Sequence, residues 1–303
     1  MQNILNLIRW KNLLMIAFVQ LLIKYALFNS LAVDTYLSPI NFTLLILSTL
    51  CIAAGGYIIN DIYDVETDTI NKPNLVFIGK HISESKANTL YIVLTFIGVI
   101  IGFYLANGIG KPKFFGFFVI IAALLYVYST SLKQIAVVGN IIVSFLVASS
   151  ILIVGVFELL PAINEQNKNL QSTMFEVLAD FGIFAFLLNF IREIVKDIQD
   201  VDGDHKSGMQ TLPIILGKSR TAKIAFTLTL TTIAIIVFYV TKYLFMHKEV
   251  VIYFLALVVG PLIYTAIKLF TAEKNSHFKH ISLILKITML TGMLVMVLYW
   301  FIF

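Results

Sequence analysis

Long apolar runs separated by short polar segments dominate the chain. Each run has about 20 residues, which is the helical length that crosses the hydrocarbon core of a bilayer. The runs are too long for barrel strands, and a helix satisfies its own backbone hydrogen bonds within lipid. The pattern therefore predicts an all-α, polytopic membrane bundle. The predicted spans are 12–32, 41–60, 88–107, 114–132, 135–160, 176–196, 221–242, 250–270 and 281–303.

Composition and charge agree with a membrane protein. The chain is 59% hydrophobic and 13% charged, whereas a soluble domain usually carries about a quarter charged residues. With a cytoplasmic N-terminus, 16 of the 22 Lys and Arg residues fall on the cytoplasmic side and 6 on the other, as the positive-inside rule requires. We therefore expect a multi-pass protein of the cell (inner) membrane, and basic loops rather than a nucleic-acid partner account for the net charge of +5.

Acidic residues gather in two short windows, 61–68 and 193–204, which hold nine of the 17 in the chain. The topology puts both windows on the cytoplasmic side. In each window the spacing is helical, so the polar side chains share one face if helix continues through them. The first face comprises Asn60, Asp61, Asp64 and Asp68, with Glu66 off the stripe. The second comprises Asn189, Glu193, Asp197, Asp200 and Asp204.

Like charges at helical spacing repel, and the cost rises near a low-dielectric bilayer. Divalent metal could offset it, since carboxylate and amide oxygens suit Mg²⁺, which completes its shell with water and substrate phosphate. Pairing with Lys72, Arg192, Lys196 or Lys206 is a second explanation. A solvated surface loop is the third, and two in-phase acidic faces disfavour it.

Other chemistry finds little support in the sequence. The five His residues show no ligand spacing beyond His277 and His280 in a polar turn, the single cysteine is Cys51, and no P-loop or nucleophile elbow occurs. Gly55-Gly56 fits close helix packing rather than phosphate binding. Four tyrosines could line a cavity and stabilise a cation with their ring faces. They are Tyr57, Tyr63, Tyr126 and Tyr128.

The two acidic windows resemble the motifs of the UbiA superfamily of intramembrane prenyltransferases. The first reads Asn-Asp-x-x-Asp-x-x-x-Asp over residues 60–68, followed by Asn71-Lys72-Pro73, and the second is "REIVKDIQDVDGD" over 192–204. The resemblance extends over nearly the whole chain and implies a single domain, 1–303, whose helices surround a central cavity. Two family features are altered. Tyr128 and Lys133 are one residue further apart than in the family's Tyr-x-x-x-Lys, and Arg9-Trp-Lys-Asn12 lacks the proline of Arg-Pro-x-Asn.

The resemblance implies Mg²⁺-dependent transfer of a polyprenyl group from its diphosphate to a lipophilic acceptor. It implies about two Mg²⁺ ions, held with the diphosphate by Asn60, Asp61, Asp64, Asp68, Asp197, Asp200 and Asp204. The same acids would be the catalytic residues, and Asn60 would also bind substrate. The remaining substrate-binding residues would be Lys72, Lys133, Arg192, Glu193, Lys196, Tyr128, Arg9 and Asn12.

The acceptor is expected to be a prenylglycerol phosphate. Arg192 to Asp204 with Thr211-Leu212-Pro213 look most like geranylgeranylglycerol-phosphate geranylgeranyltransferases, although Gln199 stands where an acid is common. An aromatic prenyltransferase of menaquinone or ubiquinone synthesis is the alternative, and a protohaem farnesyltransferase is less favoured because no extra His or Arg pattern suggests a porphyrin site. An ion-coupled transporter is disfavoured because no paired Asp and Lys is evident inside a span. The sequence leaves the prenyl length and the oligomeric state open.

Overall fold

The computed structural model describes residues 2–302, in which nine helical segments are long and apolar enough to cross a membrane. No strand occurs within that range, where the extended pairing is confined to isolated bridges such as Ile135–Gln210. The predicted all-α architecture and the number of spans are therefore confirmed. The chain divides into two compact units, residues 1–133 with 149–180 and residues 134–148 with 181–303. The interpretation of 1–303 as one domain stays a prediction.

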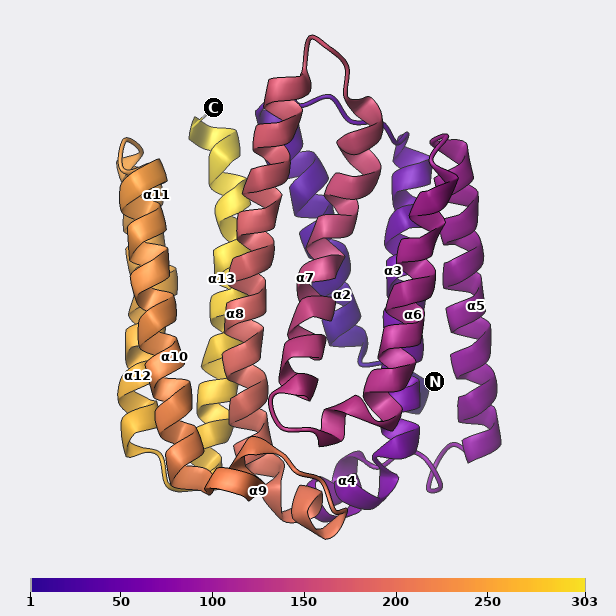
Figure 1. Ribbon diagram of the computed structural model, residues 1–303, viewed down its shortest axis with the longest axis vertical. Coiled ribbons are helices and arrows are strands. Elements are labelled where there is room, and N and C mark those ends of the chain that lie inside the picture. The colour runs from indigo at the N-terminus through magenta and orange to yellow at the C-terminus, as the bar shows by residue number, and fades with distance from the viewer. Residues whose placement is uncertain (1, 303) are drawn as a thin grey trace. The chain divides into compact units, whose positions relative to one another are not determined.

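The first unit is built around α3 (Pro39–Tyr63), which packs against both α5 (Glu84–Gly108) and α6 (Phe115–Thr130) (Figure 1). Glycines allow the close approach. A Cβ on Gly55 would lie 2.4 Å from Thr95 Oγ1, and one on Gly56 would lie 2.7 Å from Leu125 Cδ2. The packing role expected for Gly55-Gly56 is therefore confirmed. The unit also contains α1 (Gln2–Leu7), α2 (Trp10–Leu21) with its π-helical extension (Leu22–Phe28), and α4 (Val65–Asn71).

A buried ion pair ties the π-helical extension of α2 to α7 (Val138–Glu158). Lys24 Nζ lies 2.6 Å from Glu158 Oε1 and donates to Leu37 O at 2.7 Å, while Leu37 N donates to Glu158 Oε2 at 2.9 Å. The side chains are only 8% and 0% exposed. The sequence analysis expected no paired Asp and Lys inside a span, and it did not foresee this Lys–Glu pair because its partners lie in different spans, 134 residues apart in the chain. Both groups bind the backbone of Leu37, so the pair anchors the 29–38 loop.

The second unit contains the carboxyl-terminal part of α8 (Lys168–Lys206) and the helices that follow it, whose ribbons run from orange to yellow in Figure 1. Its core joins these helices through Val195, Ile198, Ala225, Leu262 and Ile281. The helices are α9 (Leu212–Leu216), α10 (Lys218–Tyr239) with a π-helical end (Val240–Leu244), α11 (Lys248–Phe254) continued by a π-helical turn (Leu255–Val259), α12 (Gly260–Thr271) and α13 (Asn275–Ile302).

Two helices extend beyond the predicted spans. The second span continues to Tyr63 and is followed directly by α4, and the sixth runs from Lys168 to Lys206 instead of 176 to 196. The expected loops at 61–87, 161–175 and 197–220 are therefore partly helical. Hydropathy marks where a chain enters lipid, whereas a helix continues into water as long as its polar residues satisfy their hydrogen bonds.

Replacing Gly98 by Ala is expected to destabilise the contact between α3 and α5. A Cβ there would lie 2.9 Å from the Ser48 carbonyl oxygen and 2.7 Å from Ile52 Cγ1. Backbone atoms cannot rotate away, so overpacking should lower the free energy of unfolding by about 1–3 kcal/mol. Thermal unfolding in detergent measures this, and Gly116→Ala is the matched control because no atom lies within 4 Å of its Cβ. Equal unfolding temperatures for the two variants would contradict the close approach.

Candidate functional site

The first acidic motif lies where α3 gives way to α4. Asn60 and Asp61 are on the last turn of α3, and Asp64 forms the joint between the helices. Helical hydrogen bonds cross the joint, from Asp64 N to Asn60 O at 2.9 Å and from Asp68 N to Asp64 O at 2.8 Å. Asn60 Nδ2 also donates to Asp64 Oδ2 at 2.6 Å. The expectation that Asn60 and Asp64 share one face is therefore confirmed.

Three cations neutralise the carboxylates of this motif. Arg9 Nη2 lies 2.7 Å from Asp61 Oδ1, and Lys133 Nζ lies 2.6 Å from Asp64 Oδ1. Lys72 Nζ is 3.8 Å from Asp68 Oδ1, one helical turn away. Pairing with Lys72 was one of the explanations open from the sequence, whereas Arg9 and Lys133 reach the motif from 52 and 69 residues away in the chain. Both were sequence candidates, and the structure places both against the motif.

Arg9 is directed to Asp61 by an unusual backbone. It has φ 51° and ψ 52°, the left-handed conformation, where α1 ends and α2 begins. A non-glycine residue pays a steric cost there, which the surrounding contacts must offset. The guanidinium also lies 5.0 Å from the centre of the Tyr57 ring. Burial lowers the pKa of Arg9, but the charges of Asp61 and Tyr57 outweigh it, so the pKa is raised.

Asp68 lies in α4, outside the membrane spans, and its pKa is raised. Burial raises its pKa to about 6, Lys72 acts in the opposite direction, and the neighbouring charges of Asp64 and Asp61 add to the rise. The carboxylate is therefore ionised at neutral pH but takes up a proton in mildly acidic solution. Glu66 of the same helix lies off the acidic stripe.

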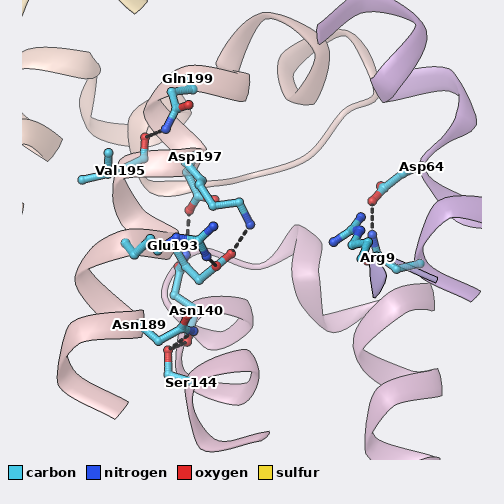
Figure 2. A network of polar contacts seen from close by, with 12 residues as sticks. Arg9, Asp64, Asn140, Ser144, Asn189, Glu193, Val195, Asp197 and Gln199 are labelled. Atoms are coloured by element: carbon cyan, nitrogen blue, oxygen red, sulfur yellow. Dashed lines mark hydrogen bonds and ion pairs between the residues drawn. The ribbon is translucent and has the colours of Figure 1, made fainter. Parts of the chain in front are cut away.

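The second acidic motif lies entirely within α8, so its five polar residues share one face of a continuous helix, as expected. Two of them bind α7. Asn140 Nδ2 donates to Asp197 Oδ2 at 2.8 Å, and Asn189 Nδ2 donates to Ser144 Oγ at 3.2 Å (Figure 2). Asn140 and Ser144 were not identified from the sequence. The sequence pattern that could have identified them is two polar residues one helical turn apart in an apolar span.

Glu193 links the two basic residues of the second motif. Its carboxylate contacts Arg192 Nη1 at 3.1 Å and Lys196 Nζ at 2.7 Å. Arg192 and Lys196 thus form the pairing with an acid that was the second explanation open from the sequence. Asp204 is buried and Asp200 half-buried, whereas Asp202, off the stripe, is exposed and 3.9 Å from Lys218.

The remaining sequence candidates lie near the ends of α3 and α6 and in the first turn of α2. Tyr126 stacks on Tyr91 of α5, with ring centres 6.5 Å apart, and Tyr63 is largely exposed. Tyr128 is half-buried near the end of α6. Asn12 is half-buried, and its backbone N–H donates to Arg9 O at 2.8 Å.

The donor set fits Mg²⁺, a hard cation that prefers oxygen ligands. Among residues 2–302, no group of three or more His, Cys, Asp or Glu converges closely enough to hold a metal. Mg²⁺ commonly takes one or two carboxylates and fills its shell with water and substrate phosphate. The first face offers two carboxylates and an amide on adjacent turns, in Asn60, Asp61 and Asp64, so the residues suit a site that the substrate completes.

The chain is similar to several archaeal enzymes. A digeranylgeranylglyceryl phosphate synthase from Sulfolobus acidocaldarius is 37% identical over 191 residues, 62% of each chain. Another from Korarchaeum cryptofilum is 31% identical over 250 residues, 80% of each chain. The first alignment thus spans less than two thirds of its relative, and the second most of it. The resemblance drawn from the motifs is confirmed.

Solved structures show the same fold. A structure described as digeranylgeranylglyceryl phosphate synthase in membranes has a TM-score of 0.68 at 24% identity, covering 100% of this chain and 99% of its own. A UbiA homologue from Archaeoglobus fulgidus bound to GPP and Mg²⁺ has a TM-score of 0.58 at 17% identity, covering 97% and 99%. The sequence of residues 21–290 matches the UbiA prenyltransferase family. The protein is therefore an integral, multi-pass membrane protein that belongs to the UbiA prenyltransferase family.

Proposed function

We propose that the protein transfers a geranylgeranyl group from its diphosphate to a prenylglycerol phosphate in membrane lipid synthesis. The observation that carries the proposal is the pair of acidic helix faces, each at the end of an apolar helix and each in contact with basic side chains. Two further facts support it. Relatives with 31% and 37% identity are named digeranylgeranylglyceryl phosphate synthases, and a homologue of the same fold binds GPP and Mg²⁺.

Each acidic face would hold Mg²⁺ with diphosphate oxygens and water completing the shell. Asn60, Asp61, Asp64 and Asp68 would serve one Mg²⁺ ion, and Asp197, Asp200 and Asp204 a second. When bound, Mg²⁺ would draw negative charge from the leaving diphosphate and so favour cleavage of the allylic C–O bond. The prenyl chain would lie among the apolar spans. A membrane-spanning fold therefore suits the substrate, because the prenyl chain is long and apolar.

The basic residues would change partners during binding. In this structure Arg9 and Lys133 neutralise Asp61 and Asp64. A cation that binds those carboxylates releases both side chains, which then reach diphosphate oxygens through charge-assisted hydrogen bonds. Arg192 and Lys196 are proposed to bind the phosphate of the acceptor, with Glu193 as their partner in its absence.

The orientation of the protein is also proposed. The excess of Lys and Arg on one set of loops favours a cytoplasmic N-terminus and cytoplasmic acidic motifs in the cell membrane. Both water-soluble groups, the diphosphate and the acceptor phosphate, would then be supplied from the cytoplasm. The buried Lys24–Glu158 pair does not favour the transporter alternative, because both side chains bind the backbone of Leu37 in the 29–38 loop.

Asp64→Asn and Asp197→Asn are each expected to reduce Mg²⁺-dependent release of diphosphate from geranylgeranyl diphosphate by about a hundredfold or more, since each removes a proposed metal ligand. Diphosphate release in detergent or liposomes measures the effect, and helix content and thermal unfolding report folding. Glu66→Gln is the matched control, because it removes an acid from the same segment but off the stripe. Wild-type turnover in either Asn variant would refute the metal assignment.

The acceptor can be identified from the labelled product. Membranes containing the protein receive labelled geranylgeranyl diphosphate with either a prenylglycerol phosphate or a dihydroxynaphthoate. We expect labelled diether lipid phosphate, and Lys196→Gln should raise the KM for that acceptor because a phosphate contact is lost. A labelled naphthoate would establish the aromatic alternative. Solute uptake into proteoliposomes with no prenylated product would instead indicate a transporter.

Acid should weaken Mg²⁺ binding through Asp68. Its pKa is raised to about 6, so protons compete with metal below that pH, and the Mg²⁺ concentration for half-saturation should rise as pH falls from 7 to 5 by up to about tenfold per pH unit below 6. The diphosphate titrates as well, so the comparison is with Asp68→Asn. That variant should bind more weakly but with a flatter pH profile, whereas Glu66→Gln should keep the wild-type slope. Parallel profiles for wild type and Asp68→Asn would contradict the role of Asp68.

A further inference from the structure

A chain of buried polar side chains connects α7 with the acidic face of α8. Asn189 donates to the hydroxyl of Ser144, which donates to the backbone carbonyl oxygen of Asn140 one helical turn earlier at 2.6 Å, and the Asn140 side-chain amide donates to Asp197 (Figure 2). The residues Asn140, Ser144 and Asn189 are 6%, 0% and 4% exposed. We call these three residues the polar ladder. It ends on one carboxylate oxygen of the second acidic motif.

Such a ladder is costly inside an apolar bundle. A buried amide or hydroxyl without a partner destabilises the folded protein, and polar groups within membrane helices generally face the interior. Apolar residues at 140 and 144 would let α7 pack against α8 without burying a polar group that needs a partner. The polar ladder is therefore explained best by what it does for the group at its end, Asp197.

The backbone fixes the start of α7 where the ladder begins. Val137 has φ 68°, a left-handed conformation that is strained for a β-branched residue. Just before it, Gln134 O accepts from Gln210 N at 2.9 Å, and Ile135 forms a bridge with Gln210. The segment after α8 thus holds the segment before α7. These contacts fix the backbone at the beginning of α7, three residues before Asn140.

We propose that Asn140 is a positioning residue for the Mg²⁺–diphosphate site. Its amide occupies Oδ2 of Asp197 and fixes the rotamer of that side chain, so that Oδ1 is presented to the cation. Ser144 holds the helix turn that carries Asn140, and Asn189 secures Ser144 from α8. Residues that orient metal ligands in this way commonly change metal affinity or activity by about 10–100-fold when replaced. The proposal rests on the proposed function, because it requires Asp197 to bind metal.

A purely structural role makes a different prediction. Hydrogen bonds between membrane helices also hold bundles together, and loss of such a bond lowers stability without changing the Mg²⁺ requirement of the folded protein. A positioning role changes the Mg²⁺ requirement itself. The two roles are therefore separated by measuring metal dependence and stability on the same samples.

The experiment uses the full-length protein in detergent and geranylgeranyl thiodiphosphate, a poorly reacting analogue of the prenyl donor. Calorimetry gives the Mg²⁺ concentration that half-saturates binding of the analogue, and thermal unfolding without metal gives stability. Asn140→Leu, which keeps the size but removes the donor, should raise that concentration about 10–100-fold. Ser144→Ala should produce a smaller rise in the same direction, and it keeps the test informative if Asn140→Leu does not fold.

Two comparisons decide the outcome. Thr229→Val is the matched control, since it removes a buried hydroxyl of the second unit that donates to Ala225 O within α10, and its Mg²⁺ requirement should equal that of wild type. In the Asp197→Asn background, Asn140→Leu should add nothing, because it acts through Asp197. A wild-type Mg²⁺ requirement in both ladder variants, or full additivity with Asp197→Asn, overturns the positioning role alone. Failure of the wild-type protein to bind the analogue with Mg²⁺ overturns the proposed function and the ladder with it.

Discussion

Negative charge gathered at the edge of an apolar bundle is the constraint on which the rest of the structure depends. Carboxylates repel one another and lose hydration beside lipid, so each must have a cation, a hydrogen-bond donor or water. The first acidic motif is neutralised by Arg9 and Lys133 from distant parts of the chain. The second is supported by amide donors of α7 and by basic residues of its own helix. In both motifs, side chains from elsewhere in the chain or from the same helix thus stabilise the carboxylates.

The cationic partners have a second consequence. A side chain that pairs with a carboxylate when metal is absent is already next to the place where an anionic substrate would bind, and it needs only to change partners. Binding of metal and diphosphate would then be coupled through the same lysines and arginine. The left-handed Arg9 fits this view, because backbone strain at a functional residue persists only where surrounding contacts favour the position.

Polar groups away from the acidic motifs serve the bundle itself. Lys24 and Glu158 are almost fully buried, yet each also binds backbone of the 29–38 loop, so the pair closes a loop rather than lining a path for ions. Glycines also stabilise the bundle, because the absence of a side chain lets α3 pack closely against α5 and α6. The long unbroken α8 carries one whole acidic face on a rigid element, which suits a site that must hold several oxygens at fixed spacing.

The sequence alone determined the fold class, the nine spans and the two acidic faces, because lipid imposes a length and helices impose a period of 3.6 residues. It also indicated Arg9, Asn12 and Lys133 as candidates, through resemblance and not through spacing. Only the tertiary structure decided which polar side chains meet: Arg9 with Asp61, Lys133 with Asp64, Lys24 with Glu158, and Asn140 with Asp197. These partners are between 52 and 134 residues apart, and no local periodicity reports a contact between helices. Packing of the spans alone brings such residues together.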